Sequence, residues 1–373
     1  MSTTLELRSL ITPEGELRLT LEDLPVAAPG PDEVVIRVEA APINPSDLAV
    51  LLGPADLTTL RTDRSSGRPV TTARILPQLA ARAAARAGKS LPIGNESAGV
   101  VVDAGTNARH LIGKVVGAVG GAMYTRYRRV SVSDVLPFPA GVTSKQGAAA
   151  FVNPLTALCF LTTMRLEGHK ALVHTAAASN LGQMLNKLCI ADGVDLVNVV
   201  RTDEQVAILK AIGAKHVVNS TAPDFRERLL AAVSETGATL AFDAVGGGTL
   251  AEQILNAMEA ALVAKTPPVG PYGSPVHKQV YVYGRLDQSP TTVGPGAGLA
   301  WGMGGWYLFY YLKRIGAEAE QKLRDRVANE ITTTFASSYA REISLAEAID
   351  SDIIRAYQRR ATGEKYLIVP SRD

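Results

Sequence analysis

A run of small residues, 175–179, separates an apolar segment from a segment with helical periodicity. The apolar segment begins at Ala171 and is typical of a buried parallel strand. The periodic segment begins at Asn180, and a second apolar strand follows at 194–200. A strand, a tight turn of small residues, a helix and a strand together form a βαβ unit of the length that binds dinucleotides.

The turn itself carries a modified glycine fingerprint. Where dinucleotide-binding folds have G-x-G-x-x-G, this chain has Ala177-x-Ser179-x-x-Gly182. Small side chains still let the turn approach a pyrophosphate, and the N–H groups at a helix start favour an anion. Gly182 allows the helix to pack closely on the strand. The pattern predicts a dinucleotide site, although an ordinary strand–helix turn of an α/β protein would show it too.

Arg201 ends the second predicted strand and indicates which cofactor the turn binds. A cofactor with a free ribose 2′-hydroxyl calls for Asp or Glu at this position, whereas a 2′-phosphate calls for a cation with several donors. The planar guanidinium of Arg meets that requirement. We therefore predict NADPH rather than NADH. The alternative is a solvated Arg201, or one that forms a surface ion pair with Asp203 or Glu204.

Composition describes a globular protein of more than one domain. The chain has 373 residues, of which 46% are hydrophobic and 20% charged, and its net charge is +2. These values predict two domains and no general attraction to nucleic acid or to a membrane. Cys159 and Cys189 lie in apolar segments and cannot form a disulfide framework. With no signal-peptide segment and no apolar run of the ~20 residues that cross a bilayer, we expect a cytoplasmic protein.

Strands and helices alternate from 171 to 286, which predicts a parallel sheet with helices on both faces. The residues before 150 indicate mainly β structure, because apolar and polar residues alternate between Gly- and Pro-rich turns. After this core we expect a glycine-rich loop at 294–305, helices at 306–327 and 345–359, and strands at 332–335 and 365–369.

Residues 53–93 form a basic insertion between two predicted β segments. We expect a loop over 61–72 and an Ala-rich helix over 76–87, with Arg82 and Arg86 on one helix face. A solvated loop and helix is the simpler interpretation. The alternative is a basic lid that binds the phosphates of a substrate such as a coenzyme A thioester.

The sequence lacks the signatures of metal and nucleophilic catalysis. Two cysteines cannot build a structural zinc site, His110 is the only histidine before residue 150, and no serine lies in a G-x-S-x-G elbow. We therefore expect no zinc. What remains is hydride transfer, in which the cofactor supplies the hydride and a proton must also be provided. Candidate proton donors are Tyr124, Tyr127 and Tyr283, each of which could equally be a packed aromatic residue.

Nine motifs are spread over most of the chain, and their sequences and order together resemble the medium-chain dehydrogenase/reductase superfamily. The chain is most similar to the zinc-free branch of that superfamily, which contains quinone oxidoreductases and 2-enoyl thioester reductases. The resemblance implies an α/β fold, with a Rossmann domain of doubly wound parallel sheet at 151–314. It also implies a GroES-like β-rich domain built from both chain ends, 1–150 and 315–373. The motifs are INPSDL (43–48), PIGNESAGVVVDAG (92–105), FVNPLTALCFL (151–161), HTAAASNLGQMLNKL (174–188), NVVR (198–201), LKAIGAKHVVN (209–219), FDAVGGG (242–248), YVYGRL (281–286) and GEKYLIVP (363–370).

The resemblance further implies roles for individual residues. The family is commonly homodimeric through edge strands of two Rossmann sheets, and 279–285 would be that strand here. The implied contacts are Asn44 and Thr156 with the nicotinamide end; Ser179, Asn180, Leu181 and Gly182 with the pyrophosphate; Arg201 and Thr202 with the 2′-phosphate; Ala244, Val245 and Gly246 with the ribose; and Tyr283, Gly284 and Arg285 with the nicotinamide.

One departure from the family bears on the substrate. Enoyl reductases of this type usually carry a catalytic tyrosine between the NPxD and GxE segments, and residues 48–93 contain none. We therefore expect an NADPH-dependent, zinc-independent reductase of a quinone or α,β-unsaturated carbonyl, a small-molecule acceptor, with Tyr124 as the candidate catalytic acid. The alternatives are an enoyl-thioester reductase and a non-enzymatic NADPH-binding sensor or structural protein.

Overall fold

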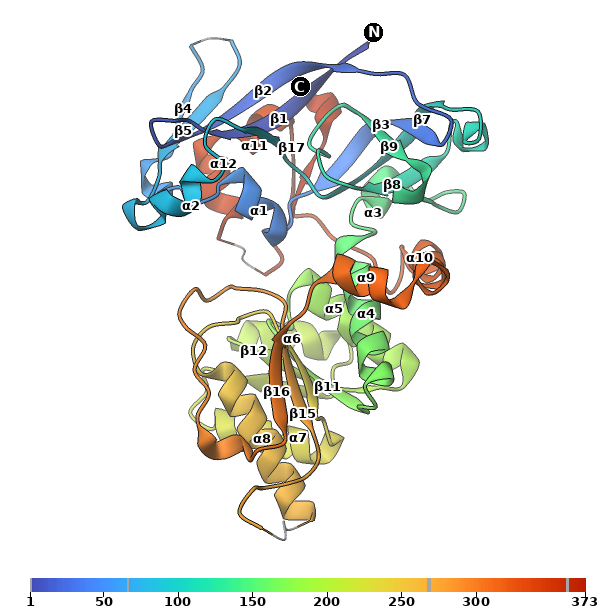
Figure 1. Cartoon of the computed structure of the whole chain (residues 1–373). Coiled ribbons are helices and arrows are strands. Elements are labelled where there is room, and N and C mark those ends of the chain that lie inside the picture. The colour runs from blue at the N-terminus through green and yellow to red at the C-terminus, as the bar shows by residue number, and fades with distance from the viewer. Residues whose placement is uncertain (1, 66, 267–269, 360–361) are drawn as a thin grey trace. The chain divides into compact units, whose positions relative to one another are not determined.

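The chain divides into two compact units, each with its own sheets (Figure 1). Unit 1 contains Met1–Val152 and Arg324–Asp373, and therefore joins both chain ends, whereas unit 2 contains Asn153–Leu323. The predicted fold class, an α/β protein with a β-rich domain and a parallel-sheet domain, is confirmed. The computed structural model describes residues 2–65, 67–266, 270–359 and 362–373.

A long antiparallel hairpin of residues 2–26 contributes two of the five strands of the first sheet of unit 1. Its apolar side chains alternate with polar ones, so that Leu7, Leu17 and Leu19 are fully buried on one face. The order of the strands is β4-β5-β2-β1-β6. Their bounds are β1 (Ser2–Ile11), β2 (Glu16–Val26), β4 (Arg61–Asp63), β5 (Val70–Arg74) and β6 (Ser90–Pro92).

The basic insertion is part of this sheet. The loop predicted over 61–72 is wrong at both ends, which form β4 and the start of β5, whereas the described residues between these strands are loop as expected. Thr71 and Ala73 alternate with more exposed neighbours, which is a strand pattern. The helix predicted over 76–87 is reduced to a 3-10 turn and α2 (Ala80–Ala84). The side chain of Arg82 lies outside the described part of the structure.

The second sheet of unit 1 contains seven strands around β3, and its strand from the C-terminal segment pairs with β3 at Leu367 and Pro42. The strand predicted at 332–335 is wrong, because these residues form a turn after a helix. The helix predicted at 345–359 is two helices, since the Asp350 carboxylate caps the second one. The strands are β3 (Glu33–Pro42), β7 (Glu96–Ala104), β8 (Val115–Val119), β9 (Tyr127–Ser131), β10 (Val135–Pro137), β17 (Arg341–Ile343) and β18 (Tyr366–Ile368), and the helices of unit 1 include α1 (Pro45–Leu51), α3 (Ser144–Gly147), α11 (Leu345–Ala348) and α12 (Ser351–Tyr357).

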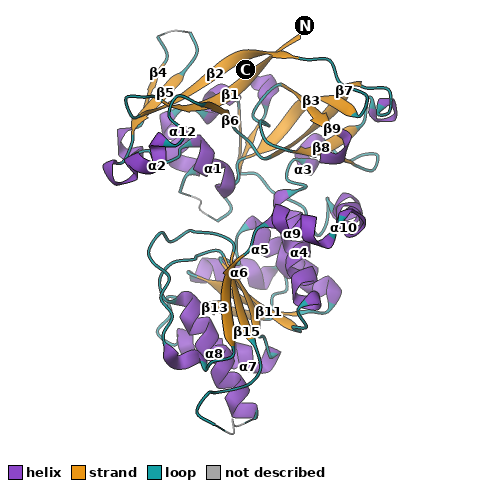
Figure 2. Cartoon of the chain, in the orientation of Figure 1, coloured by secondary structure: helices purple, strands orange, loops and turns teal. Residues whose placement is uncertain are grey.

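Unit 2 is a six-stranded parallel sheet between helices (Figure 2). Branched residues such as Val173, Val197 and Val280 fill its core, as expected for strands buried on both faces. The strand order is β13-β12-β11-β14-β15-β16. The strands are β11 (Ala171–Thr175), β12 (Asp195–Val200), β13 (His216–Asn219), β14 (Leu240–Asp243), β15 (Lys278–Val282) and β16 (Trp301–Gly305), and the helices are α4 (Val152–Leu166), α5 (Asn180–Asp192), α6 (Asp203–Ala211), α7 (Phe225–Thr236), α8 (Leu250–Lys265) and α9 (Leu308–Ile315), with α10 (Ala317–Glu330) crossing the boundary between the units.

Two expectations for the end of unit 2 are wrong. The predicted glycine-rich loop at 294–305 contains β16, which pairs in parallel with β15. Consequently 279–285 is not the edge of the sheet, and it cannot be the strand that pairs with a second copy. The helical region predicted at 306–327 is confirmed from Leu308 onward, and it consists of two helices, α9 and α10, separated at Gly316, where the backbone takes a positive φ of 85°.

Among the described residues, none of the helices combines the length and the apolarity that a membrane span requires.

Candidate functional site

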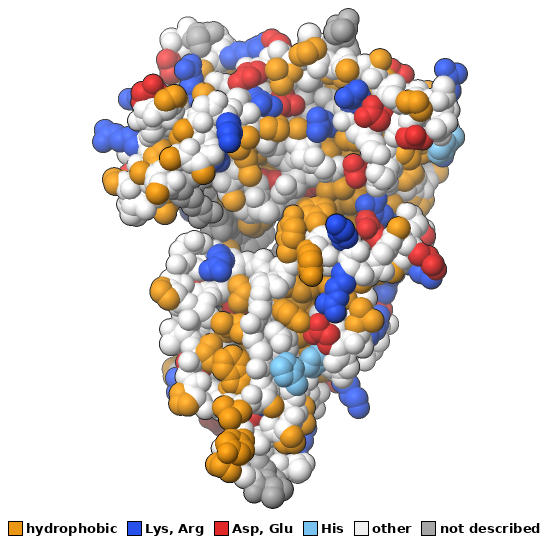
Figure 3. Space-filling view, in the orientation of Figure 1, with side chains coloured by type: hydrophobic (Ala, Val, Ile, Leu, Met, Phe, Trp, Pro, Cys, Tyr) orange, Lys and Arg blue, Asp and Glu red, His pale blue; other side chains and the backbone are white. Residues whose placement is uncertain are grey.

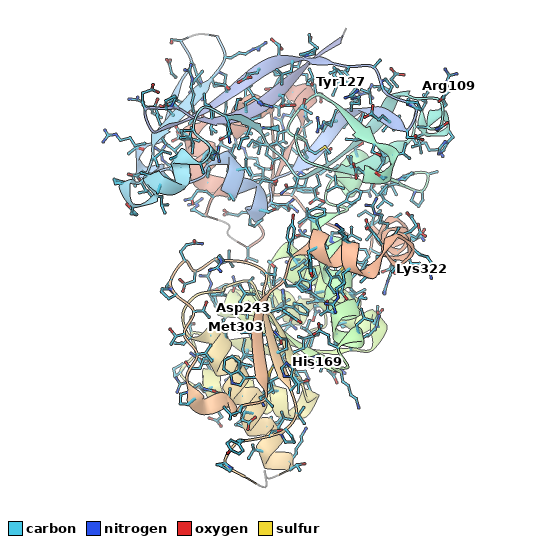
Figure 4. The ribbon with its side chains drawn as sticks, viewed as in Figure 1. Arg109, Tyr127, His169, Asp243, Met303 and Lys322 are labelled. Atoms are coloured by element: carbon cyan, nitrogen blue, oxygen red, sulfur yellow. The ribbon has the colours of Figure 1, made fainter. Side chains whose placement is uncertain are left out.

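The carboxyl ends of β11 and β14 lie where the strand order reverses, which is where open α/β sheets bind ligands. Thr175 Oγ1 donates to Asp243 Oδ1 over 2.6 Å and accepts from the Ala244 N–H over 2.8 Å. Asp243, at this end of the sheet in Figure 4, also accepts from the N–H groups of Val245 (2.8 Å) and Gly246 (3.0 Å). The two buried side chains therefore fix the turn that follows β14. The sequence analysis did not identify Thr175 or Asp243 as site residues. Each is a polar residue at the end of an apolar strand, and that pattern could have identified them.

The carbonyl groups of this turn also have partners. The Leu286 N–H donates to the carbonyl of 244 over 3.2 Å, and the Asp287 N–H donates to that of 245 over 3.0 Å. The Thr291 hydroxyl donates to the carbonyl of 246. Residues 244–246, which the resemblance assigns to the ribose, thus have their backbone groups hydrogen-bonded within the protein. These residues can therefore contact a ligand through van der Waals interactions rather than through backbone hydrogen bonds.

Glycine is required in this turn because two backbones approach closely. A Cβ atom at Gly246 would lie 2.6 Å from the Gly284 carbonyl oxygen, and one at Gly247 would lie 2.7 Å from the Ser289 carbonyl oxygen. Both distances are far below van der Waals contact. The glycine run after β14 therefore allows the segment that follows β15 to cover it.

The small-residue turn before α5 shows the same kind of constraint. A Cβ atom at Gly182 would lie 2.1 Å from the Ala177 carbonyl oxygen, so only glycine permits this packing of α5 on the turn. Ala176 has a positive φ of 51°, a conformation that costs a non-glycine residue of the order of 1 kcal/mol. Strain of this kind is concentrated at ligand-binding turns.

Helix α5 begins at the position predicted for anion binding. Ser179 is its N-cap, and its hydroxyl accepts from the Gly182 N–H over 3.2 Å. Asn180 and Leu181 form the first turn, where helix geometry provides no intrahelical acceptor for the N–H groups. This end of the helix carries the positive end of the dipole and favours a phosphate.

Arg201 lies exposed after β12, and within the described ranges its guanidinium has no acidic partner. The two acids that could compete for it have other contacts. Asp203 accepts from the Asn219 side-chain amide over 2.9 Å, and a hydrogen bond from the Thr202 hydroxyl lowers the pKa of Glu204. Thr202 is also the N-cap of α6. The guanidinium is therefore available to a ligand.

A hollow of about 760 Å³ opens at the carboxyl ends of β15 and β16. Its wall is mainly aromatic and glycine-rich, and Trp306 is held by an indole N–H bond to Thr163 Oγ1 of 3.3 Å. Thr156, predicted at the nicotinamide end, is buried in α4. The residues that line the hollow are Val282, Tyr283, Gly284, Arg285, Thr291, Met303, Gly304, Gly305, Trp306 and Tyr307.

Tyr283 is fixed by a buried histidine. The Tyr283 hydroxyl lies 2.7 Å from His174 Nε2. Burial lowers the pKa of His174 to about 3 and raises the pKa of the Tyr283 hydroxyl far above its ordinary value. Both groups are therefore uncharged at neutral pH, and the pair acts as a fixed part of the wall.

Asn44, in unit 1, belongs to a separate buried polar cluster. Its side-chain N–H donates to Glu96 Oε1 over 2.7 Å, and its backbone N–H donates to Asp47 Oδ2 over 2.8 Å. Its amide oxygen, Oδ1, has no partner in the described part of the chain. Burial raises the pKa of Asp47 to about 6.

Tyr124, the predicted catalytic acid, lies in the same cluster and is fully buried. Its hydroxyl is 2.9 Å from Asp47 Oδ2 and 3.1 Å from the Pro42 carbonyl oxygen. Burial, followed by the charge of Asp47, raises the pKa of this hydroxyl well above its usual range. These contacts hold the start of α1 in place.

Two basic side chains of the insertion, those of Arg64 and Arg86, bind the protein itself. Arg64 pairs with Asp350, and Arg86 donates to the Val50 carbonyl (2.9 Å) and to the Ser9 hydroxyl (2.8 Å). This arrangement argues against the basic-lid interpretation, because these guanidinium groups already have partners.

Across the described ranges, His, Cys, Asp and Glu side chains nowhere gather in a group of three that could hold a metal ion.

Comparison with known proteins gives three results. A family model described as "Zinc-binding dehydrogenase" matches residues 181–264. Among curated proteins, the chain is 27% identical over 208 residues to the mitochondrial enoyl-[acyl-carrier-protein] reductase of Xenopus tropicalis (54% of this chain, 51% of that protein) and 26% identical over 242 residues to prostaglandin reductase-3 of Mus musculus (64% and 56%). The chain spans about half the length of the first of these relatives.

Solved structures match over nearly the whole chain. A Mesorhizobium loti protein proposed to be an NADPH:quinone reductase has 28% identity and a TM-score of 0.74, with 99% of each chain covered. The Escherichia coli quinone oxidoreductase complexed with NADPH has 20% identity and a TM-score of 0.69, with 99% of this chain and 100% of that chain covered. At 20% identity, the similarity to the Escherichia coli protein shows only that the two chains share a fold.

Proposed function

Because the chain belongs to the medium-chain dehydrogenase/reductase superfamily, we propose that it is an NADPH-dependent, zinc-independent oxidoreductase whose acceptor is a quinone or an α,β-unsaturated carbonyl. The observation that carries the proposal lies at the carboxyl ends of β11 and β12, where a tight turn meets the start of α5 and the Arg201 guanidinium has no acidic partner among the described residues. A phosphorylated dinucleotide requires these two features together.

The residues present fit NADPH. Gly182 leaves the turn before α5 without the side chain that would obstruct it, and the helix start favours the pyrophosphate. Arg201 would bind the 2′-phosphate through its planar fork. The other proposed contacts are Ser179, Asn180 and Leu181 for the pyrophosphate, Thr202 for the 2′-phosphate, Ala244, Val245 and Gly246 for the ribose, and Asn44, Thr156, Tyr283, Gly284 and Arg285 for the nicotinamide.

When bound, NADPH supplies the hydride that reduces the acceptor. The chain's own residues bind and orient the reactants. Thr175 and Asp243 fix the turn after β14, and the His174–Tyr283 pair provides a neutral, rigid wall. Because the Tyr124 hydroxyl is engaged by Asp47 and Pro42, we propose that a quinone acceptor takes its protons from solvent. The reduced oxygens of a quinone do not need a strong acid within the protein.

An enoyl-thioester reductase is the second candidate, favoured by the curated enoyl reductase relatives. The assay that separates the candidates follows NADPH oxidation with a panel of quinones, enones and enoyl thioesters. Turnover of quinones and enones but not of thioesters supports the first proposal, and the reverse supports the second. If NADPH binds but no acceptor is turned over, the protein is a non-enzymatic NADPH-binding sensor or structural protein.

We also propose a homodimer that forms through β16. This strand is the edge of the unit 2 sheet, and an edge strand presents unpaired backbone groups to another strand. Apolar side chains gather on the visible face around β16 and the start of α9 (Figure 3). They include Leu299, Met303 and Tyr307, which are 72%, 40% and 64% exposed. An exposed apolar patch beside a strand edge favours association with a second copy.

A further inference from the structure

Asn219 is the last residue of β13, beside the strand that leads to Arg201. In the parallel register it lies opposite Val200, the last residue of β12. The Asn219 side-chain amide donates to Asp203 Oδ1 over 2.9 Å, and its amide oxygen accepts from the Thr221 N–H over 3.0 Å. Both ends of this half-buried amide are therefore engaged next to the proposed 2′-phosphate site.

The same network reaches the backbone of Arg201. The Thr221 hydroxyl lies 2.9 Å from the Asn219 amide oxygen and 3.0 Å from the Arg201 carbonyl oxygen, either of which can accept its proton. The Arg201 N–H donates to Gln205 Oε1 over 2.9 Å. The backbone of Arg201 is thus held from two sides, while its side chain stays exposed.

Asp203 is the acid closest to Arg201 in the sequence, and both residues are exposed. Opposite charges at such a spacing attract each other, and an ion pair would occupy the guanidinium that a 2′-phosphate requires. In the structure the Asp203 carboxylate instead accepts the Asn219 amide and lines a hollow of about 500 Å³. Arg201 is not among the described residues that line this hollow. The next acid, Glu204, accepts from the Thr202 hydroxyl.

We propose that Asn219 is a positioning residue that determines the preference for a 2′-phosphorylated cofactor, because its amide holds the Asp203 carboxylate away from Arg201. The inference rests on the proposed NADPH-dependent function and concerns the cofactor specificity of that site. The residue type matters, since Asn provides both a donor for Asp203 and an acceptor for Thr221. A hydrogen bond to a charged carboxylate is also stronger than one between neutral groups. N219D would lose the donor and present a second carboxylate to Asp203.

Calorimetric titration of the full-length protein tests the proposal without turnover. The two ligands are adenosine 2′,5′-bisphosphate and adenosine 5′-monophosphate, which differ only in the 2′-phosphate, and the ratio of their dissociation constants is the readout. We expect N219D to reduce the preference for the bisphosphate by about fivefold or more, because the released Asp203 competes for Arg201 and the added carboxylate repels the phosphate. The affinity for the monophosphate should stay close to that of the wild type.

The double variant D203N/N219D exchanges the donor and the acceptor of this hydrogen bond and keeps the net charge of the wild type. The amide at 203 would then donate to the carboxylate at 219, which still accepts from Thr221. The preference should therefore return to within about twofold of the wild-type value, a coupling that only interacting residues show. N329D adds the same charge as N219D at an exposed residue of α10, and this matched control should retain the wild-type ratio.

Several outcomes would overturn the proposal. An unchanged ratio in N219D, or equal weakening of both nucleotides, would mean that Asn219 does not influence recognition of the 2′-phosphate. A reduced ratio that D203N/N219D fails to restore would mean that Asn219 does not act through Asp203. A wild type that binds both nucleotides equally would refute the role of Arg201 and this inference with it.

The unfolding temperature verifies that each variant is folded. N219A is the second variant, which removes the donor without adding a charge and should also lower the ratio. Failure of the proposed oxidoreductase function has a different signature: the wild type oxidises NADPH with no acceptor, whereas these titrations still report on Asn219 because neither nucleotide carries a nicotinamide.

Discussion

The Thr175 hydroxyl and the Asp243 carboxylate are 2.6 Å apart and connect the ends of β11 and β14. The same hydroxyl accepts from the Ala244 N–H, and the same carboxylate accepts from two further N–H groups of the turn. The shape of the turn that faces the proposed cofactor site therefore depends on two side chains that need not touch the cofactor.

Replacement of Thr175 tests this dependence. T175V removes the hydroxyl and leaves the buried Ala244 N–H without an acceptor, which costs about 1–3 kcal/mol of unfolding free energy. We expect a lower unfolding temperature and NADPH binding weakened about tenfold, measured by thermal denaturation and by fluorescence titration. T175S keeps the hydroxyl and is the matched control. If T175V and T175S behave alike, the hydroxyl does not hold the turn.

Replacement of Gly182 tests the close packing of α5. In G182A the new Cβ would lie 2.1 Å from the Ala177 carbonyl oxygen, so the helix must move. Overpacking of this kind costs about 1–3 kcal/mol, and the displaced helix start should also bind NADPH less tightly. G270A is the control, since a Cβ atom there meets nothing within 4 Å. Equal unfolding free energies for the two variants would contradict the packing argument.

The cofactor preference depends on Arg201. We expect R201M to lose at least tenfold in NADPH affinity, because the 2′-phosphate loses its cation, while NADH affinity changes little. Titration of both reduced cofactors against protein fluorescence measures the ratio. R226M, at an exposed site on α7, serves as the control. A wild type with equal affinities for the two cofactors would refute the assignment of Arg201 to the 2′-phosphate.

Buried His174 should make the protein acid-sensitive. Its pKa falls from 6.5 to about 3 on folding, because burial disfavours the charged imidazolium. Below pH ~6.5 the unfolded chain therefore binds a proton at this histidine, whereas the folded chain does not bind it until the pH reaches about 3. The stability present above pH ~6.5 is therefore lost as the pH falls through this window, by up to about 1.4 kcal/mol per pH unit.

Chemical denaturation at several pH values measures this loss. The double variant H174L/Y283F removes both members of the hydrogen-bonded pair and should lose this part of the pH dependence. Y283F alone keeps the histidine and should retain it. Parallel pH profiles for wild type and double variant would show that His174 does not contribute.

The proposed dimer can be tested at the edge strand. In M303K a charge replaces a half-exposed apolar side chain on β16, and burial of that charge in a paired edge is unfavourable. We expect the variant to sediment as a monomer at concentrations where the wild type is a dimer. V276K, at an exposed apolar residue before β15, is the control. A monomeric wild type would refute the dimer.

The sequence by itself determined the elements that depend on short-range pattern. The βαβ unit was predictable because branched apolar residues, a run of small residues and a helical period follow one another directly between residues 171 and 200. Arg201 was predictable as a candidate because its position relative to this unit is local. For the same reason, the fold class followed from the alternation of strands and helices.

Only the tertiary structure decided which distant groups meet. Thr175 and Asp243 come together because their strands are neighbours in the sheet, which no local pattern reports. Residues 301–305 are rich in glycine and have little intrinsic preference for a strand; they form β16 because β15 offers a row of free backbone groups. The hairpin at 61–74 and the hollow beside Arg285 likewise exist only through packing, where long-range hydrogen bonds and contacts outweigh the composition of the segment.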